Sequence, residues 1–282
     1  RIALGFVDRM RSAGHYALLA LEQEMPDAAY GAREPQVAAT RLQWWVEELS
    51  AAPASGGHHP LTELLFADRR ARSIAASTWT APALAAIAQL SRGTAADFPA
   101  QLEAAGVLHG ALATLETQWW YGSRASTQRA TRVAVLGQLL HALRALAEDA
   151  DRDCLPLPMV RLAQHGLNRE RLRQPDPASA QAVRDQLLDL QRGLVESARM
   201  SGPLSVFRVV QWREARQSLA HALAAADSQA ALAVVPARPG LWDTLLAWRT
   251  AAAWRQADPW GTGRECATAD MANALGPDGA HH

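Results

Sequence analysis

Apolar residues recur three and four positions apart along almost the whole chain. This spacing gathers them on one face of an α-helix, whereas a half-buried strand needs strict alternation of apolar and polar residues. Clear alternation with β-branched residues does not occur, and the residues that dominate the sequence, Ala, Leu, Arg, Glu and Gln, favour helices. We therefore predict an all-α protein of roughly ten helices.

Proline and glycine mark where these helices should end. The first helix should stop near Pro26, and the second should end before Pro53. His58-His59-Pro60 should open a short helix, while Gly122 and Gly166 should end two others, the latter as a left-handed C-cap. The longer helices are expected over about 4–24, 95–120, 126–151, 205–225 and 241–256. Because no segment resembles a flexible linker and no repeat of fixed period occurs, we predict one domain over residues 1–282.

Charge and cysteine content exclude several classes of protein. The 28 basic residues, all arginine, balance 28 acidic ones and form no basic stripe, so nucleic acid is not an expected partner. Cys154 and Cys266 form no CxxC pair, which indicates a reducing compartment and a cytoplasmic protein. The longest uncharged run, residues 73–91, is too polar for a transmembrane helix, although peripheral contact with a membrane is compatible with the sequence.

One segment, residues 136–167, carries a specific motif. Gln138, Arg144 and Asp149 lie on one expected helix, followed by Leu157-Pro158 and then Gly166. The segment resembles the second aspartate-rich region of squalene and phytoene synthases, which reads G-x-x-x-Q-x-x-N-x-x-R-D-x-x-x-D, then L-P and a small helix ending in H/E-G. These residues fall at the family's spacing without a gap, whereas Gly137 is displaced from the family's glycine.

Two further segments support the resemblance. The run from Arg41 to Leu49, followed by His59-Pro60-Leu61, is similar to the family's R-L-x-W-W-x-x-E-L segment and the helix-opening H-P after it. Residues 16–22 resemble the family's first long helix. The resemblance implies an isoprenoid-synthase fold, with antiparallel helices around a deep central apolar cavity. It also implies enzymes that join two prenyl diphosphates head to head, with Mg²⁺ held between two facing D-x-x-x-D motifs.

The chain departs from the family at the metal-binding positions. The first motif falls at residues 26–30, where Pro26 and Tyr30 have replaced the outer carboxylates and only Asp27 remains. In the second motif Ala145 replaces the leading aspartate while Asp149 is kept. A lone carboxylate is a poor Mg²⁺ site. Alternatively, Asp149 and Asp153 are four residues apart, so a metal site could have moved one helical turn along.

Other residues are candidates for binding rather than for holding metal. The resemblance implies a substrate-binding role for Arg41, Gln138, His141 and Arg144. His141, which replaces the family's asparagine, could be a base in the cavity or a hydrogen-bonded interior histidine. We interpret the Trp44-Trp45 pair as core and rim. The segment from Trp119 to Tyr121 could instead line the cavity mouth or a partner surface.

Three hypotheses about function follow. The first is a catalytically degenerate family member that binds a lipid-like ligand or a protein partner. The second is an active, Mg²⁺-dependent prenyl-diphosphate transferase with a shifted metal site, and magnesium is the cofactor only in that case. The third is a purely structural helical protein, whose interior should be filled by side chains.

Overall fold

The structure, a computed structural model, describes residues 13–31, 34–144, 146, 155–172, 177–224 and 241–256. All regular secondary structure in these ranges is helical, which confirms the all-α prediction. No helix in this described part is both long and apolar enough to span a bilayer. The helices are α2 (Ala13–Tyr30), α3 (Pro35–Ser55), α4 (Pro60–Ala67), α5 (Arg69–Arg72), α6 (Ala76–Gln89), α7 (Phe98–Tyr121), α8 (Gln128–Arg144), α9 (Met159–Gln164), α10 (Arg169–Leu172), α11 (Pro177–Ser197), α12 (Val206–Ala224) and α14 (Leu241–Gln256).

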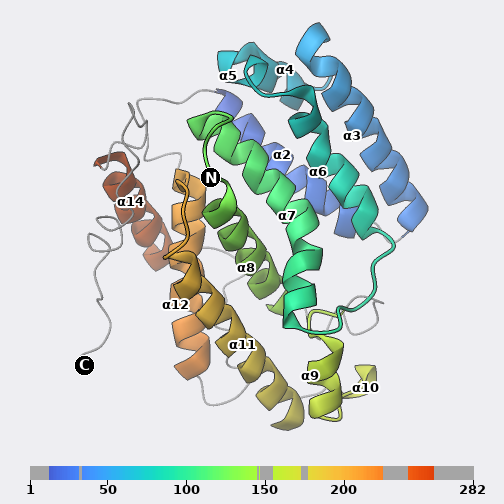
Figure 1. Ribbon diagram of the computed structural model, residues 1–282, viewed down its shortest axis with the longest axis vertical. Coiled ribbons are helices and arrows are strands. Elements are labelled where there is room, and N and C mark those ends of the chain that lie inside the picture. The colour runs from blue at the N-terminus through green and yellow to red at the C-terminus, as the bar shows by residue number, and fades with distance from the viewer. Residues whose placement is uncertain are drawn as a thin grey trace.

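The helices form two groups on either side of a central pair (Figure 1). The pair is α7 and α8, which pack along each other. Helices α2, α3 and α6 lie on one side with the short α4 and α5, while α11, α12 and α14 lie on the other. One hydrophobic cluster joins buried residues from α2 through to α14, although the expected single domain over residues 1–282 extends beyond the described ranges and stays a prediction.

Aromatic side chains connect the two groups of helices through the core. The ring of Trp79 lies 4.9 Å from that of Phe66 and 6.2 Å from that of Trp119, while Trp120 lies 5.5 Å from Trp254. Trp119 and Trp120 are only 2% and 5% exposed, so their expected place at a cavity mouth or partner surface is wrong. The tryptophan side chains at the end of α7 face the core, because burial of each ring removes a large apolar area from water.

Prolines do not end helices where expected. Helix α2 runs through Pro26 to Tyr30, and α3 runs through Pro53 to Ser55, so both predicted interruptions are wrong. A proline inside a helix removes one backbone hydrogen bond, at a cost of about 3 kcal/mol. In α2 the buried residues Met25, Ala28 and Ala29 surround Pro26, and their tertiary packing offsets this loss.

The expected glycine caps and the L-P turn are present. Gly122 and Gly166 have φ angles of 84° and 58° and follow α7 and α9, as predicted. Leu157 is fully buried, and the turn around it packs on residues 94–96, where the amide of Met159 donates to the carbonyl of Ala95 at 2.8 Å. Helix α8 ends at Arg144 in the described residues, and the remainder of the expected helix to residue 151 lies outside them.

The W-W-x-x-E-L segment has a structural role that centres on Glu48. This carboxylate is 7% exposed and accepts hydrogen bonds from the amides of His58 and His59, at 2.7 and 2.9 Å, and from the hydroxyl of Thr62 at 2.5 Å. Burial by itself would raise the pKa of Glu48, but the hydrogen bonds from Thr62, His58 and His59 lower it to about 2. Glu48 therefore joins α3 to the start of α4.

Replacing Glu48 with Gln should destabilise the protein by about 1–3 kcal/mol at neutral pH, because the neutral amide cannot give charge-assisted acceptance to three donors. A carboxyl with a lowered pKa contributes stability that is present above its unfolded pKa and lost as the pH falls toward 2. The difference in melting temperature between wild type and Glu48→Gln should therefore shrink with acidification. The neighbouring exposed Glu47→Gln is the control and should stay within about 0.5 kcal/mol of wild type.

Candidate functional site

Arg41 lies on the surface between α2 and α3 rather than in the interior. Its guanidinium donates to the carboxylate of Glu24 at 2.5 Å, and the two side chains are 51% and 34% exposed. Arg41 thus pairs with an acid from the first helix, one of the roles open to a cation at this position. Because the pair is solvent-exposed, its contribution to stability is small, about 0–1 kcal/mol.

The other predicted residues that the structure describes belong to two different helices. Asp27 is exposed on α2, and Gln138 is half-buried on α8. The side chain of Arg144, and Asp149 and Asp153 entirely, lie outside the described residues. Within the described ranges no three His, Cys, Asp or Glu side chains gather into a group that could hold a metal ion. The described residues therefore do not fit a Mg²⁺ site, which needs several oxygen ligands.

The interior histidine is His109 rather than His141. His141 is exposed on α8, so its prediction as a buried, hydrogen-bonded histidine is wrong. His109 on α7 is 7% exposed, and its Nε2 has no hydrogen-bond partner among the described residues. Burial, together with the positive fields of Arg208 and His141, lowers the pKa of His109 to about 4. His109 is therefore a neutral imidazole.

A buried acid–arginine cluster occupies the space between three helices. We define it as Glu22 of α2, Glu116 of α7 and Arg208 of α12. The Arg208 Nη2 donates to Glu22 Oε2 at 2.9 Å, and its Nε lies 2.5 Å from Glu116 Oε2 in a close ion pair. The side chains are 9%, 1% and 10% exposed, respectively. Because α2 and α12 belong to different helix groups, Arg208 connects the two sides of the fold.

Two polar residues of the α12 segment complete the cluster. Ser205 donates a hydrogen bond from its hydroxyl to Glu116, and Arg208 Nη1 donates to Gln211 Oε1 at 2.9 Å. Gln211 in turn packs against Gly137 of α8, where an added Cβ would lie 2.3 Å from the Gln211 amide nitrogen. Gly137 therefore allows α8 to approach α12 closely.

One cation and two carboxyls make the charge of this cluster depend on a proton. Burial raises the pKa of Glu22 well above its ordinary value, and the negative field of Glu116 and a hydrogen bond with it act in the same direction, while Arg208 opposes them. Burial alone would lower the pKa of Arg208, but Glu116 and Glu22 together raise it. The raised pKa of Glu22 therefore favours the protonated form of this carboxyl beside the Arg208–Glu116 ion pair.

These interior residues were missed by motif matching, although the sequence contained a signal for them. Glu116 is an isolated charge in the apolar run 107–121, and Arg208 is an isolated charge in the run 203–212. A lone charge on an otherwise apolar helix face is costly to bury unless a partner faces it. Which isolated charges face each other, however, depends on how distant helices pack.

A separate hollow lies away from this cluster. It is an open groove of about 790 Å³ between α7, α8 and the segment before α8. Its lining mixes apolar residues such as Leu102 and Val135 with the charged Glu103 and Arg132. None of the predicted site residues lines this groove.

Replacing Glu22 with Gln should flatten the decline in stability toward high pH. The protonated, raised-pKa carboxyl contributes stability that is present at low pH and lost as the pH rises through its folded-state pKa. Glutamine cannot ionise and can still donate to Glu116, so melting temperatures measured from about pH 5 to 9 should fall less for the variant than for wild type. Glu24→Gln, two residues further along α2 and partly exposed, should keep the wild-type slope.

Replacing Arg208 with Met tests the cation of the same cluster. This variant should lower the free energy of unfolding by about 3–5 kcal/mol, because it leaves the Glu116 carboxylate buried without a cation. If Glu22→Gln followed the wild-type slope and Arg208→Met melted like wild type, the cluster would have no role in stability.

Comparisons with known proteins agree with this architecture. The squalene/phytoene synthase family profile matches residues 3–254. A solved structure, squalene synthase HpnC from Alicyclobacillus acidocaldarius, is similar with a TM-score of 0.58 at 14% identity, over 90% of this chain and 87% of that one. At that identity the likeness shows the fold alone. No curated protein matches the chain. Since the family profile covers most of the sequence, the chain belongs to the squalene/phytoene synthase family.

Proposed function

We propose that this protein is a catalytically degenerate member of its family, which keeps the helical shell and uses it to bind a lipid-like ligand or a protein partner. The observation that carries the proposal is the position of Arg208 between the interior carboxyls of Glu22 and Glu116. A buried carboxyl that already has an internal cation partner is a poor ligand for an external one, because the metal would have to displace the arginine.

The state of the remaining acids supports the same proposal. Asp27 is a single exposed carboxylate, with Pro26 and Tyr30 at the positions where family members carry aspartates. Glu24 is occupied by Arg41. A diphosphate carries several negative charges and requires compensating cations, whereas the one cation of the interior cluster, Arg208, is already paired with two carboxyls. Such an interior favours a ligand without charge, or binding of a partner by the outer surface of the helices.

The rival function is an active, Mg²⁺-dependent head-to-head prenyl-diphosphate transferase. Family membership favours this rival, since squalene and phytoene synthases act on prenyl diphosphates, and Asp149 and Asp153 would be its shifted metal ligands. The two functions differ in a measurable way, because only the enzyme couples magnesium to diphosphate binding and release.

The protein should show no Mg²⁺-dependent stabilisation by farnesyl or geranylgeranyl diphosphate. A ligand that binds the folded state stabilises it by about 2.7 kcal/mol at a hundredfold excess over its dissociation constant, which a thermal-shift titration detects readily. We expect the same melting temperature with Mg²⁺ and with a chelator, and no release of diphosphate. Farnesol, the uncharged analogue, separates binding of the isoprenoid chain from binding of the diphosphate.

An increase in melting temperature that requires Mg²⁺, together with release of diphosphate, would refute the proposal that the protein is catalytically degenerate. In that case Asp149→Asn with Asp153→Asn should abolish the Mg²⁺ effect, whereas Glu103→Gln on α7 should preserve it. An increase in melting temperature with prenyl ligands that is the same with and without Mg²⁺ would support a helical fold that binds a lipid-like ligand. Absence of any shift would favour the protein-partner form of the proposal.

A further inference from the structure

Over residues 245–251 the last described helix, α14, buries small residues and exposes two large apolar ones. Ala247, Thr250 and Ala251 are at most 2% exposed, so the backbone of α14 lies close to α12. Leu245 and Trp248, one helical turn apart, are 46% and 47% exposed. In an ordinary surface helix the larger apolar side chains face the core.

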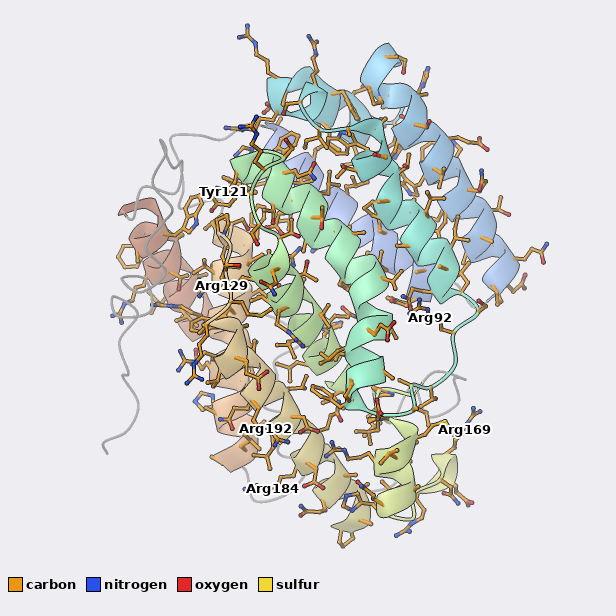
Figure 2. All side chains as sticks on the ribbon, viewed as in Figure 1. Arg92, Tyr121, Arg129, Arg169, Arg184 and Arg192 are labelled. Atoms are coloured by element: carbon orange, nitrogen blue, oxygen red, sulfur yellow. The ribbon has the colours of Figure 1, made fainter. Side chains whose placement is uncertain are left out.

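The position of α14 is fixed by its other end rather than by this outer face. Trp254 is 3% exposed, donates from its indole nitrogen to the carbonyl of Leu204 at 2.9 Å, and packs edge-on against Trp120. Tyr121, labelled in Figure 2 at the end of α7, donates to the same carbonyl at 2.7 Å. The outward direction of Leu245 and Trp248 therefore follows from how α14 is anchored.

Two arginines lie at the contact of α12 with α14, and a third, Arg216, is near enough to act on Arg213 through its positive field. Arg249 is exposed on α14 next to Trp248, and Arg213 of α12 reaches α14, where its Nη1 donates to the Thr250 hydroxyl at 3.3 Å. Arg216, also on α12, places its guanidinium carbon 4.7 Å from the ring centroid of Trp212. We call Arg213, Arg216, Arg249, Leu245 and Trp248 the α12–α14 face.

The three cations of this face repel one another. Burial, followed by the positive fields of Arg249 and Arg216, lowers the pKa of Arg213. Both charged groups that act on it within the described ranges are cations, and α12 carries one acid, the half-buried Glu214. A cluster of like charges is relieved when several anions approach it together.

We propose that the α12–α14 face docks on an anionic lipid surface. Such a surface presents many phosphate anions at once, which suits a cluster of cations, and each basic residue near it contributes measurable affinity. Tryptophan and leucine beside arginine form the pattern of helices that lie in the membrane interface, where the indole ring sits at the headgroup level. The proposal concerns the outer surface and is independent of the interior site and its ligand.

Vesicle co-sedimentation of the full chain tests this proposal. We expect binding to vesicles of phosphatidylcholine with about 30% phosphatidylglycerol, and little binding to phosphatidylcholine alone. Binding should weaken between about 0.1 and 0.5 M salt, because exposed charges are screened. Replacing Arg213, Arg216 and Arg249 together with Gln should reduce the affinity about fivefold per arginine, or about a hundredfold in all.

A matched control removes the same charge elsewhere. Arg69 and Arg72 on α5 and Arg169 beside α10 are exposed and lie away from α14 (Figures 1 and 2), so their combined replacement with Gln should leave binding unchanged. Trp248→Ser should weaken binding while the salt dependence persists. Far-ultraviolet circular dichroism establishes that each variant is folded. If the triple variant does not fold, hydrogen exchange of the wild type should still show protection of α14 upon addition of anionic vesicles.

Three results would overturn the proposal. They are equal binding to neutral and anionic vesicles, equal loss of binding in the control variant, and no binding to any vesicle. Capture of the wild type by polyglutamate but not by vesicles would also overturn it and would assign the face to an acidic protein partner.

Discussion

Arg208 extends from α12 to carboxyls on α2 and α7, and this buried contact constrains the rest of the interior. It joins helices that lie on opposite sides of the α7–α8 pair and residues that are 186 positions apart in the sequence. A buried cation requires nearby negative charge, which the carboxyls of Glu116 and Glu22 supply, and burial raises the pKa of Glu22 well above its ordinary value. The same contact that connects the two halves also takes up the acids that would otherwise be free for chemistry. One contact therefore both holds the two helix groups together and occupies two interior carboxyls.

The motifs by which the family is identified serve mainly the fold in the part of the chain that the structure describes. Glu48 caps the start of α4, Leu157 and its turn pack on residues 94–96, and Gly166 ends α9 with a positive φ. None of these roles requires a substrate. A chain can lose the metal-binding aspartates while keeping these residues, because loss of a buried cap or turn destabilises the protein whatever its activity. Motif retention in this chain is thus a sign of retained architecture.

The interior cluster and the outer α12–α14 face are separate consequences of how α12 is oriented. Arg208 lies on the side of α12 that faces the core, whereas Arg213 reaches α14 and Arg216 is exposed to solvent. Anchoring of α14 by Trp254 leaves its Leu245 and Trp248 outside. The same helix therefore supplies one arginine to the interior and others to its outer side.

The sequence by itself determined the helical class, most helix ends marked by glycine, and the family, because periodicity and motif spacing act over short distances along the chain. It did not determine that α2 and α3 continue through Pro26 and Pro53, because tertiary packing there outweighs a lost backbone hydrogen bond. It placed His141 inside, whereas the orientation of α8 leaves it exposed and buries His109 of α7 instead. The pairing of Glu22, Glu116 and Arg208 was decided only by the tertiary structure. Isolated charges in apolar runs indicate that partners must exist, but only the packing of distant helices selects which ones meet.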